Sequence, residues 1–267
     1  MANFDAQITE LVGGTIDQTA CDQWAVDGIR EIIQQLPEGL QEKCSDKSTL
    51  TNSPTALDLD TSTIGKILYC TRSNGSYDIP CRAVDPQFGH LTEDSTASNY
   101  YATSDDPAFF IRDNKVEIKP TPTAAQNGFV YHIVYPSSIN VSDVDAIANF
   151  PIEAENLLVL FVAMRQLLQF QSNMSSSWNS NITTALTNAQ NVINNNQPSS
   201  TTDAYGSLSN EDIEIMDAAL RLSSSQLAEA AARLQQDTAQ YQWYGDQYAK
   251  LSAEYARALA TLGRGDE

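Results

Sequence analysis

Residues 213–262 read IEIMDAALRLSSSQLAEAAARLQQDTAQYQWYGDQYAKLSAEYARALATL, and a large apolar side chain returns at every seventh position. An unbroken spacing of seven predicts one long helix whose large side chains form a single stripe. The positions half a repeat later are only partly apolar, so we expect one strong stripe rather than a full leucine zipper. The stripe consists of Ile213, Leu220, Leu227, Leu234, Tyr241, Tyr248, Tyr255 and Leu262.

A helix of this length needs a surface that covers its stripe. It would extend about 78 Å from Glu211 to Leu262 if unbroken, and Gly245 is its weakest position. One candidate cover is a second apolar helix of the same chain, predicted at Leu157–Phe170. The other is the same stripe on further copies of the chain, and the sequence leaves both open.

The second helix is apolar on all sides between residues 157 and 164, so its own chain or a neighbouring subunit must bury it. A weaker helix, Trp178–Ile193, places Ile182, Leu186, Ala189 and Ile193 on one face, and residues 194–210 form a polar linker. We expect packing and subunit contacts at Leu157, Leu158, Leu160, Phe161, Met164, Leu220, Leu227, Leu234, Tyr241, Tyr248, Tyr255 and Leu262.

An amphipathic helix is predicted near the N-terminus, between Thr15 and Leu40. Apolar residues recur there at spacings of three and four, which is typical of a helix with one buried face. We expect Asp22 to be its N-cap and Pro37 with Gly39 to end it.

Between Thr49 and Pro136 the apolar spacing changes to two, which predicts an antiparallel sheet. Asn74-Gly75 stands between two strand-like runs and is a strong signal for a hairpin turn. Asn127-Gly128 turns the chain into a final strand, which Pro136 ends.

A second hairpin is predicted around a two-residue loop, Asp113-Asn114. With that loop length, Ile111 lies opposite Val116 and Phe109 lies opposite Ile118 on one face of the sheet.

The charge of the chain excludes several classes of partner. Its 34 acidic and 15 basic residues give a net charge of −19, and such a surface repels phosphate backbones and anionic membranes. The first residues, MANFDAQITELVGG, do not resemble a secretory signal. The longest apolar run, 157–164, is too short to span a membrane, so we expect a soluble protein.

Motifs for catalysis are missing from the sequence. It contains no HExxH, GxSxG, GxxxxGK or GxGxxG. His90 and His132 stand far apart, and the acidic pairs Asp58/Asp60 and Asp143/Asp145 are typical of solvated turns. We expect no catalytic residues, no metal site and no cofactor.

Four cysteines occur at spacings that match no zinc pattern, which favours thiols in a reducing compartment. Cys70 and Cys81 flank the first hairpin and can face each other across it. The spacing leaves a disulfide between them open.

Aromatic residues offer a different class of function. A cluster of rings on a small sheet could bind carbohydrate, because such rings bury a large area beside polar tips. The candidates for this alternative are Tyr100, Tyr101, Phe109, Phe110, Tyr131 and Tyr135.

These elements together predict an α+β protein, a long-helix bundle with an inserted small antiparallel sheet or sandwich. The parts are an N-terminal helical part (1–48), the β domain (49–136), helices that pack with the N-terminal part (137–193), a polar linker (194–210) and the heptad-striped helix (211–267).

Several short motifs follow one another in a definite order between Thr15 and Met174. They are WAVDGIREII at 24–33 ending at Pro37, a sheet segment opening at Ile67, Asp85-Pro86, DPAFFI at 106–111 leading to Lys119-Pro120, VYP at 134–136, and FPI at 150–152 opening the apolar helix. This order resembles that of the head-to-tail connector proteins, also called adaptor or neck proteins, of tailed bacteriophages.

The resemblance implies a helical bundle with an inserted sheet domain. Members of that family form rings, often of twelve copies, between the portal protein and the tail or a second neck protein. The rings enclose the channel through which the genome leaves, and an acidic surface suits DNA that passes without sequence-specific binding. The polar linker and heptad stripe depart from the short C-terminal tail expected of the family.

We therefore expect a non-enzymatic virion protein that forms a ring with itself at the head-to-tail junction and takes part in genome ejection. It would reside in the host cytoplasm during assembly and would bind no membrane. The alternative is a tail or fibre-attachment protein whose long helix trimerises.

Overall fold

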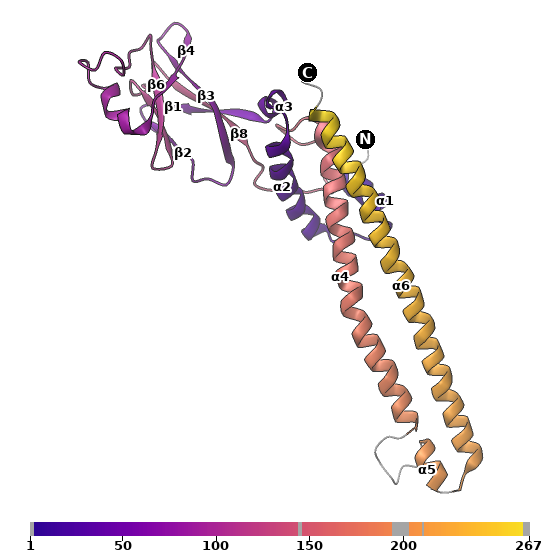
Figure 1. Cartoon of the computed structure of the whole chain (residues 1–267). Helices are drawn as coiled ribbons and strands as arrows, with labels where there is room; N and C mark the ends of the chain where they lie inside the picture. Colours follow the sequence, from indigo (N-terminus) through magenta and orange to yellow (C-terminus); the bar gives the residue numbers. More distant parts are fainter. Residues whose placement is uncertain (1–2, 144–145, 194–202, 210, 264–267) are drawn as a thin grey trace. The chain divides into compact units, whose positions relative to one another are not determined.

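The computed structural model describes residues 3–143, 146–193, 203–209 and 211–263. Its helices and two small sheets confirm the predicted α+β class (Figure 1). The chain divides into two compact units. The first unit comprises Met1–Glu10, Thr15–Val162 and Tyr255–Glu267, and the second comprises Leu11–Gly14 and Ala163–Glu254.

Three helices precede the sheets: α1 (Phe4–Val12), α2 (Gln18–Gln35) and α3 (Glu38–Lys43). Helix α2 confirms the predicted amphipathic helix, since its apolar face is buried. Leu36 is its C-cap and Pro37 follows, as expected. Helices α1 and α3 were not anticipated, because both are short.

The predicted N-cap of α2 is wrong. Asp17 caps the helix, and its Oδ1 accepts a hydrogen bond from the backbone N–H of Ala20 at 3.2 Å. Asp22 lies one turn further along, where its Oδ1 accepts from the backbone N–H of Val141 at 2.9 Å. Both aspartates precede apolar residues, so local sequence does not distinguish the cap from the tertiary contact.

Between α3 and α4 the chain forms a sandwich of two four-stranded sheets, in the orders β1-β8-β3-β4 and β2-β7-β6-β5. Leu50, Cys70 and Val130 of the first sheet pack against Val116 and Ile118 of the second. The strands are β1 (Ser45–Leu50), β2 (Ala56–Asp58), β3 (Ile64–Ser73), β4 (Asp78–Pro80), β5 (Arg82–Ala83), β6 (Ala108–Arg112), β7 (Lys115–Lys119) and β8 (Gly128–Val134), with a 3₁₀-helix η1 (Pro86–Thr92) between β5 and β6.

The first predicted hairpin is confirmed by the antiparallel pair β3 and β4. The backbone N–H of Asn74 donates to the carbonyl oxygen of Tyr77 at 3.2 Å, and Gly75 has φ 98°. A positive φ of this kind is accessible to glycine at little steric cost.

The second predicted hairpin is confirmed in its register as well. Phe109 pairs with Ile118 and Ile111 pairs with Val116 across β6 and β7. The loop residues Asp113 and Asn114 have φ 50° and 58°, the left-handed values that a two-residue type I′ turn requires.

After the sandwich come α4 (Ile152–Ile193), α5 (Ala204–Ser209) and α6 (Ile213–Gly263). The prediction of two separate helices at Leu157–Phe170 and Trp178–Ile193 is wrong, because α4 runs through both. Its Ser- and Asn-rich centre has low helix propensity, and packing against α6 stabilises it. Helix α5 lies inside the predicted linker 194–210, of which residues 194–202 and 210 fall outside the described residues.

In the first unit, α2 and α4 approach closely at Gly28. A Cβ atom there would lie 2.6 Å from Cδ1 of Phe161 and 3.1 Å from Cδ1 of Leu158. On α4, the Phe161 ring also lies 6.4 Å from the Tyr255 ring of α6, measured between centroids. The first part of α4 is therefore packed against helices from both ends of the sequence.

Gly28→Ala is expected to destabilise the protein by about 1–3 kcal/mol, because the added methyl group has no space between α2 and α4. The matched control is Gly245→Ala in α6. The atom nearest a Cβ at that position is Nε2 of Gln171, at 3.1 Å, which is the end of a flexible side chain that can shift, so the control should gain about 1 kcal/mol of helix propensity. Chemical denaturation of both variants measures the difference, and equal shifts would contradict the close contact.

Candidate functional site

The two histidines occupy structural positions. His132 is buried in β8, where its Nε2 lies 2.9 Å from Oγ of Ser48 and its Nδ1 lies 3.1 Å from the carbonyl oxygen of Ile133. Both ring nitrogens therefore have partners within the sandwich. His90 is exposed in η1, far along the chain from His132.

One acidic side chain of each predicted pair also has a structural role, because it accepts a hydrogen bond within a turn. Asp58 Oδ1 accepts from the backbone N–H of Asp60 at 3.0 Å, which is the role expected for it. Asp143 accepts from the side-chain amide of Asn140, while Asp145 lies outside the described residues. In the part of the chain that the structure describes, no three His, Cys, Asp or Glu residues are grouped to hold a metal ion.

Burial keeps the cysteine thiols protonated to a higher pH than in water. Cys44, Cys70 and Cys81 are free thiols, although the backbone N–H of Cys81 donates to the carbonyl oxygen of Cys70 at 2.9 Å. Burial raises the pKa of Cys70 and of Cys81 to about 12. Burial likewise raises the pKa of Cys44 to about 11.

Native Cys70 and Cys81 should react with iodoacetamide far more slowly than in the unfolded chain. A pKa of about 12 in place of 9.0 leaves about a thousandfold less thiolate at neutral pH. The unfolded chain releases these protons at lower pH than the folded protein, so the free energy of unfolding should also fall as the pH rises above 9.0. Rapid alkylation of the native protein, followed by mass spectrometry, would contradict this protection.

The aromatic residues proposed for carbohydrate binding do not share one face. Phe110 is buried, with its ring against Gly89, whereas Phe109 packs on the opposite side against the sandwich core. Tyr131 stacks on Tyr69 instead, with ring centroids 4.3 Å apart. The six rings therefore do not form a single platform.

The apolar run of α4 is buried by the chain itself. Leu157, Leu158, Leu160 and Phe161 have almost no exposed surface, and Met164 is half-buried. The sequence left open whether this run is buried by its own chain or by a neighbouring subunit. The structure shows that helices of the same chain bury it. Leu157, Leu158, Leu160 and Phe161 are therefore unavailable to a neighbouring subunit, and their role is internal packing.

The heptad stripe of α6 behaves differently along its length. Its first four side chains are exposed, with exposed fractions of 67% for Ile213, 42% for Leu220, 40% for Leu227 and 37% for Leu234. The remaining members, Tyr241, Tyr248, Tyr255 and Leu262, are half-buried.

A mismatch between the repeat and the helix explains this gradient. A straight helix has 3.6 residues per turn, so a strict spacing of seven rotates by about 20° per repeat around the axis. The stripe faces α4 at Tyr241, where the ring meets that of Trp178, and it has turned about 60° away by Leu220, three repeats earlier. The falling exposure from Ile213 to Leu234 follows this rotation.

The contacts between α4 and α6 confirm which side of α6 faces inward in the second unit. The Trp178 and Tyr241 rings lie 5.1 Å apart, and the Phe170 and Tyr244 rings lie 5.3 Å apart. Toward the C-terminal end of α4, small and polar residues replace the aromatic rings in the contact between the two helices. Ser223 is buried there, and its Oγ donates to the carbonyl oxygen of Ala189 at 3.4 Å.

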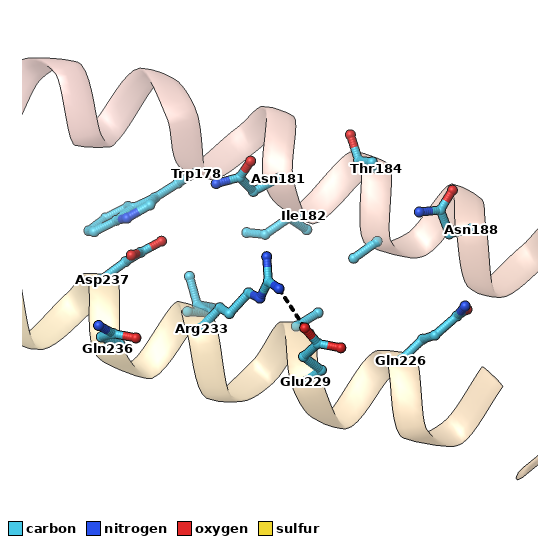
Figure 2. Close-up of a pocket in the computed structure, with 13 residues that line it drawn as sticks. Trp178, Asn181, Ile182, Thr184, Asn188, Gln226, Glu229, Arg233, Gln236 and Asp237 are labelled. Atoms are coloured by element: carbon cyan, nitrogen blue, oxygen red, sulfur yellow. Dashed lines mark hydrogen bonds and ion pairs between the residues drawn. The ribbon is translucent and has the colours of Figure 1, made fainter. Parts of the chain in front are cut away.

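A groove of about 520 Å³ separates the two helices in this small-residue region. Figure 2 shows Trp178, Asn181 and Ile182 of α4 on one side and Arg233, Gln236 and Asp237 of α6 on the other. Ala185, Ala230 and Leu234 also line it. Short side chains such as Ala185 and Ala230 leave this space between the two helices.

On α4, only Ala189 of the predicted apolar face points inward. Ile182, Leu186 and Ile193 are exposed, and sequence reasoning did not assign them to an interface. A signal for them was present, since the sequence has no charged residue between Arg165 and Asp203. Such a run is unusual for an exposed helix of a chain with a net charge of −19.

Neither a protein-family model nor a curated protein matches this sequence. Within the described ranges, no helix combines the length and the apolar composition needed to cross a membrane.

Proposed function

We propose that this chain is a non-enzymatic structural protein of a tailed bacteriophage, a subunit of the ring that connects the head to the tail. One architectural observation supports the proposal. The sandwich is inserted between α3 and α4, and the helices on its two sides pack on each other at Gly28. A helical bundle with an inserted sheet domain is the arrangement that the resemblance to connector proteins implies.

The electrostatics of the chain suit this role. An excess of 19 negative charges gives a phosphate backbone few cations to bind, so DNA can move along a ring of such subunits without being held. The proposed partners are further copies of the chain, the portal protein and a tail or second neck protein. Such a subunit assembles in the host cytoplasm and then resides at the neck of the virion.

The exposed part of the α6 stripe favours a second candidate, a tail or fibre-attachment protein whose long helix trimerises. Exposed leucines at heptad spacing are the usual seam of a helical oligomer. The two candidates differ in symmetry, since a connector forms a many-membered ring around the channel and an attachment protein forms a trimer.

Cryo-electron microscopy of purified particles of the phage that encodes this chain tests the proposal. The expected result is a ring between the portal and the tail into whose density the sandwich and the α2–α4 packing fit. Proteomics of the same particles provides the first check. Absence of the chain from purified particles would refute the connector function, and a trimeric density on the tail would favour the second candidate.

A further inference from the structure

One exposed apolar stripe of α4 and one of α6 lie on the same flank of the α4–α6 pair. The two helices are antiparallel, because Trp178 contacts Tyr241 whereas Ala189 contacts Ser223 (Figure 1). Around each helix axis, the exposed stripes lie about a quarter turn from the inward face. Because the two helices run in opposite directions, both exposed stripes lie on the same side of the pair.

The open groove gives an independent check of this geometry, because Ile182 of α4 and Leu234 of α6 both line it. We call this surface the hairpin flank. It consists of Ile182, Leu186 and Ile193 of α4 with Leu220, Leu227 and Leu234 of α6.

Between Leu220 and Leu234, the charges near the hairpin flank are compensated within α6. The exposed positions between its leucines include the small, uncharged residues Ser224, Ala228 and Ala231. The charged residues of α6 between Leu220 and Leu234 are engaged in ion pairs within the helix, Arg221 with Asp217 and Arg233 with Glu229. On α4 the flank falls within the run that has no charged residue.

The two longest segments outside the described residues are poorly suited in sequence to cover this surface. The segments outside the described residues are mostly polar in sequence, NNNQPSSTT at 194–202 and RGDE at 264–267. Polar segments gain little free energy by burying leucines. An acidic chain also does not favour an anionic membrane as the cover.

We infer that the hairpin flank binds the hairpin flank of a second copy of this chain, so that α4 and α6 of both copies form a four-helix bundle. This deepens the proposed function, on which it rests for assigning the contact to subunits of the ring. A second copy supplies the same heptad spacing in its leucines, and the absence of net charge removes the repulsion that two acidic chains would otherwise meet.

The rotation of the stripe limits the extent of this contact. Beyond Leu234 the stripe turns toward α4 and becomes half-buried at Tyr241, so the bundle includes only the part of α6 from Ile213 to Leu234. When the same surface of two copies pairs with itself, the contact is complete with two copies. A larger ring therefore needs a second, different contact. The inference therefore specifies a dimer as the unit of self-association.

Light scattering and native mass spectrometry of the purified full chain test the inference. The expected species is a dimer that dissociates on dilution. The double variant Leu220→Glu/Leu227→Glu should weaken the dimer by about a hundredfold or more, because it places carboxylates in an apolar contact. Leu186→Glu changes the α4 side of the same flank and should weaken the dimer as well.

Leu222→Glu is the matched control. It introduces the same charge at an exposed leucine of the same helix, on the flank that faces away from Leu227. This variant should dimerise like the unchanged protein. Circular dichroism of all variants should show unchanged helix content, which separates loss of the contact from loss of the fold.

Three results would overturn the inference. The chain could remain monomeric up to high micromolar concentration, it could form a trimer, or Leu222→Glu could disrupt the dimer as strongly as the double variant. The first and third results leave the connector function open, since the presence of the chain in the neck of purified particles tests that function separately. A trimer would favour the tail or fibre-attachment candidate.

Discussion

The first part of α4 must be buried on every side, and much of the fold depends on that constraint. Residues 157–163 are apolar around the full circumference of the helix and almost completely buried. A single neighbouring helix can cover only one side of such a segment. Helix α2 covers one side by close approach at Gly28, and α6 supplies Tyr255 from near the C-terminus. The sandwich is thus an insertion between two helices that are obliged to meet.

Helix α6 meets two different environments along one regular sequence repeat. Its tyrosines occur where the stripe is half-buried, in contact with the aromatic rings of α4. Its leucines Leu220, Leu227 and Leu234 occur where the stripe is exposed, whereas Leu262 at its end is half-buried. The rotation between a spacing of seven and a helical turn of 3.6 residues accounts for both. The stripe changes from leucine to tyrosine at the place where it begins to contact α4. This change supports different packing partners for the two halves of the stripe.

Electrostatics restrict where copies of so acidic a chain can meet. A net charge of −19 on each copy opposes association over most of the surface at low ionic strength. The part of α4 beyond Arg165, which has no charged residue, is an exception. It lies beside the exposed leucines of α6, so the apolar and the uncharged surfaces coincide. This coincidence favours self-association at the hairpin flank over association elsewhere.

Local sequence determined the elements whose signals are local. The turns at Asn74-Gly75 and Asp113-Asn114, the register of β6 with β7 and the existence of α2 and α6 follow from turn chemistry and apolar spacing. Only the tertiary structure decided that Asp17 rather than Asp22 caps α2, that α4 is continuous, and that Leu157 is covered from within while Leu227 is left exposed. The physical reason is that a periodic sequence gives a helix an apolar face without specifying which neighbour that face meets. The identity of the neighbour depends on contacts between residues far apart in the chain, and over many turns the gradual rotation of the stripe gives one face two different neighbours.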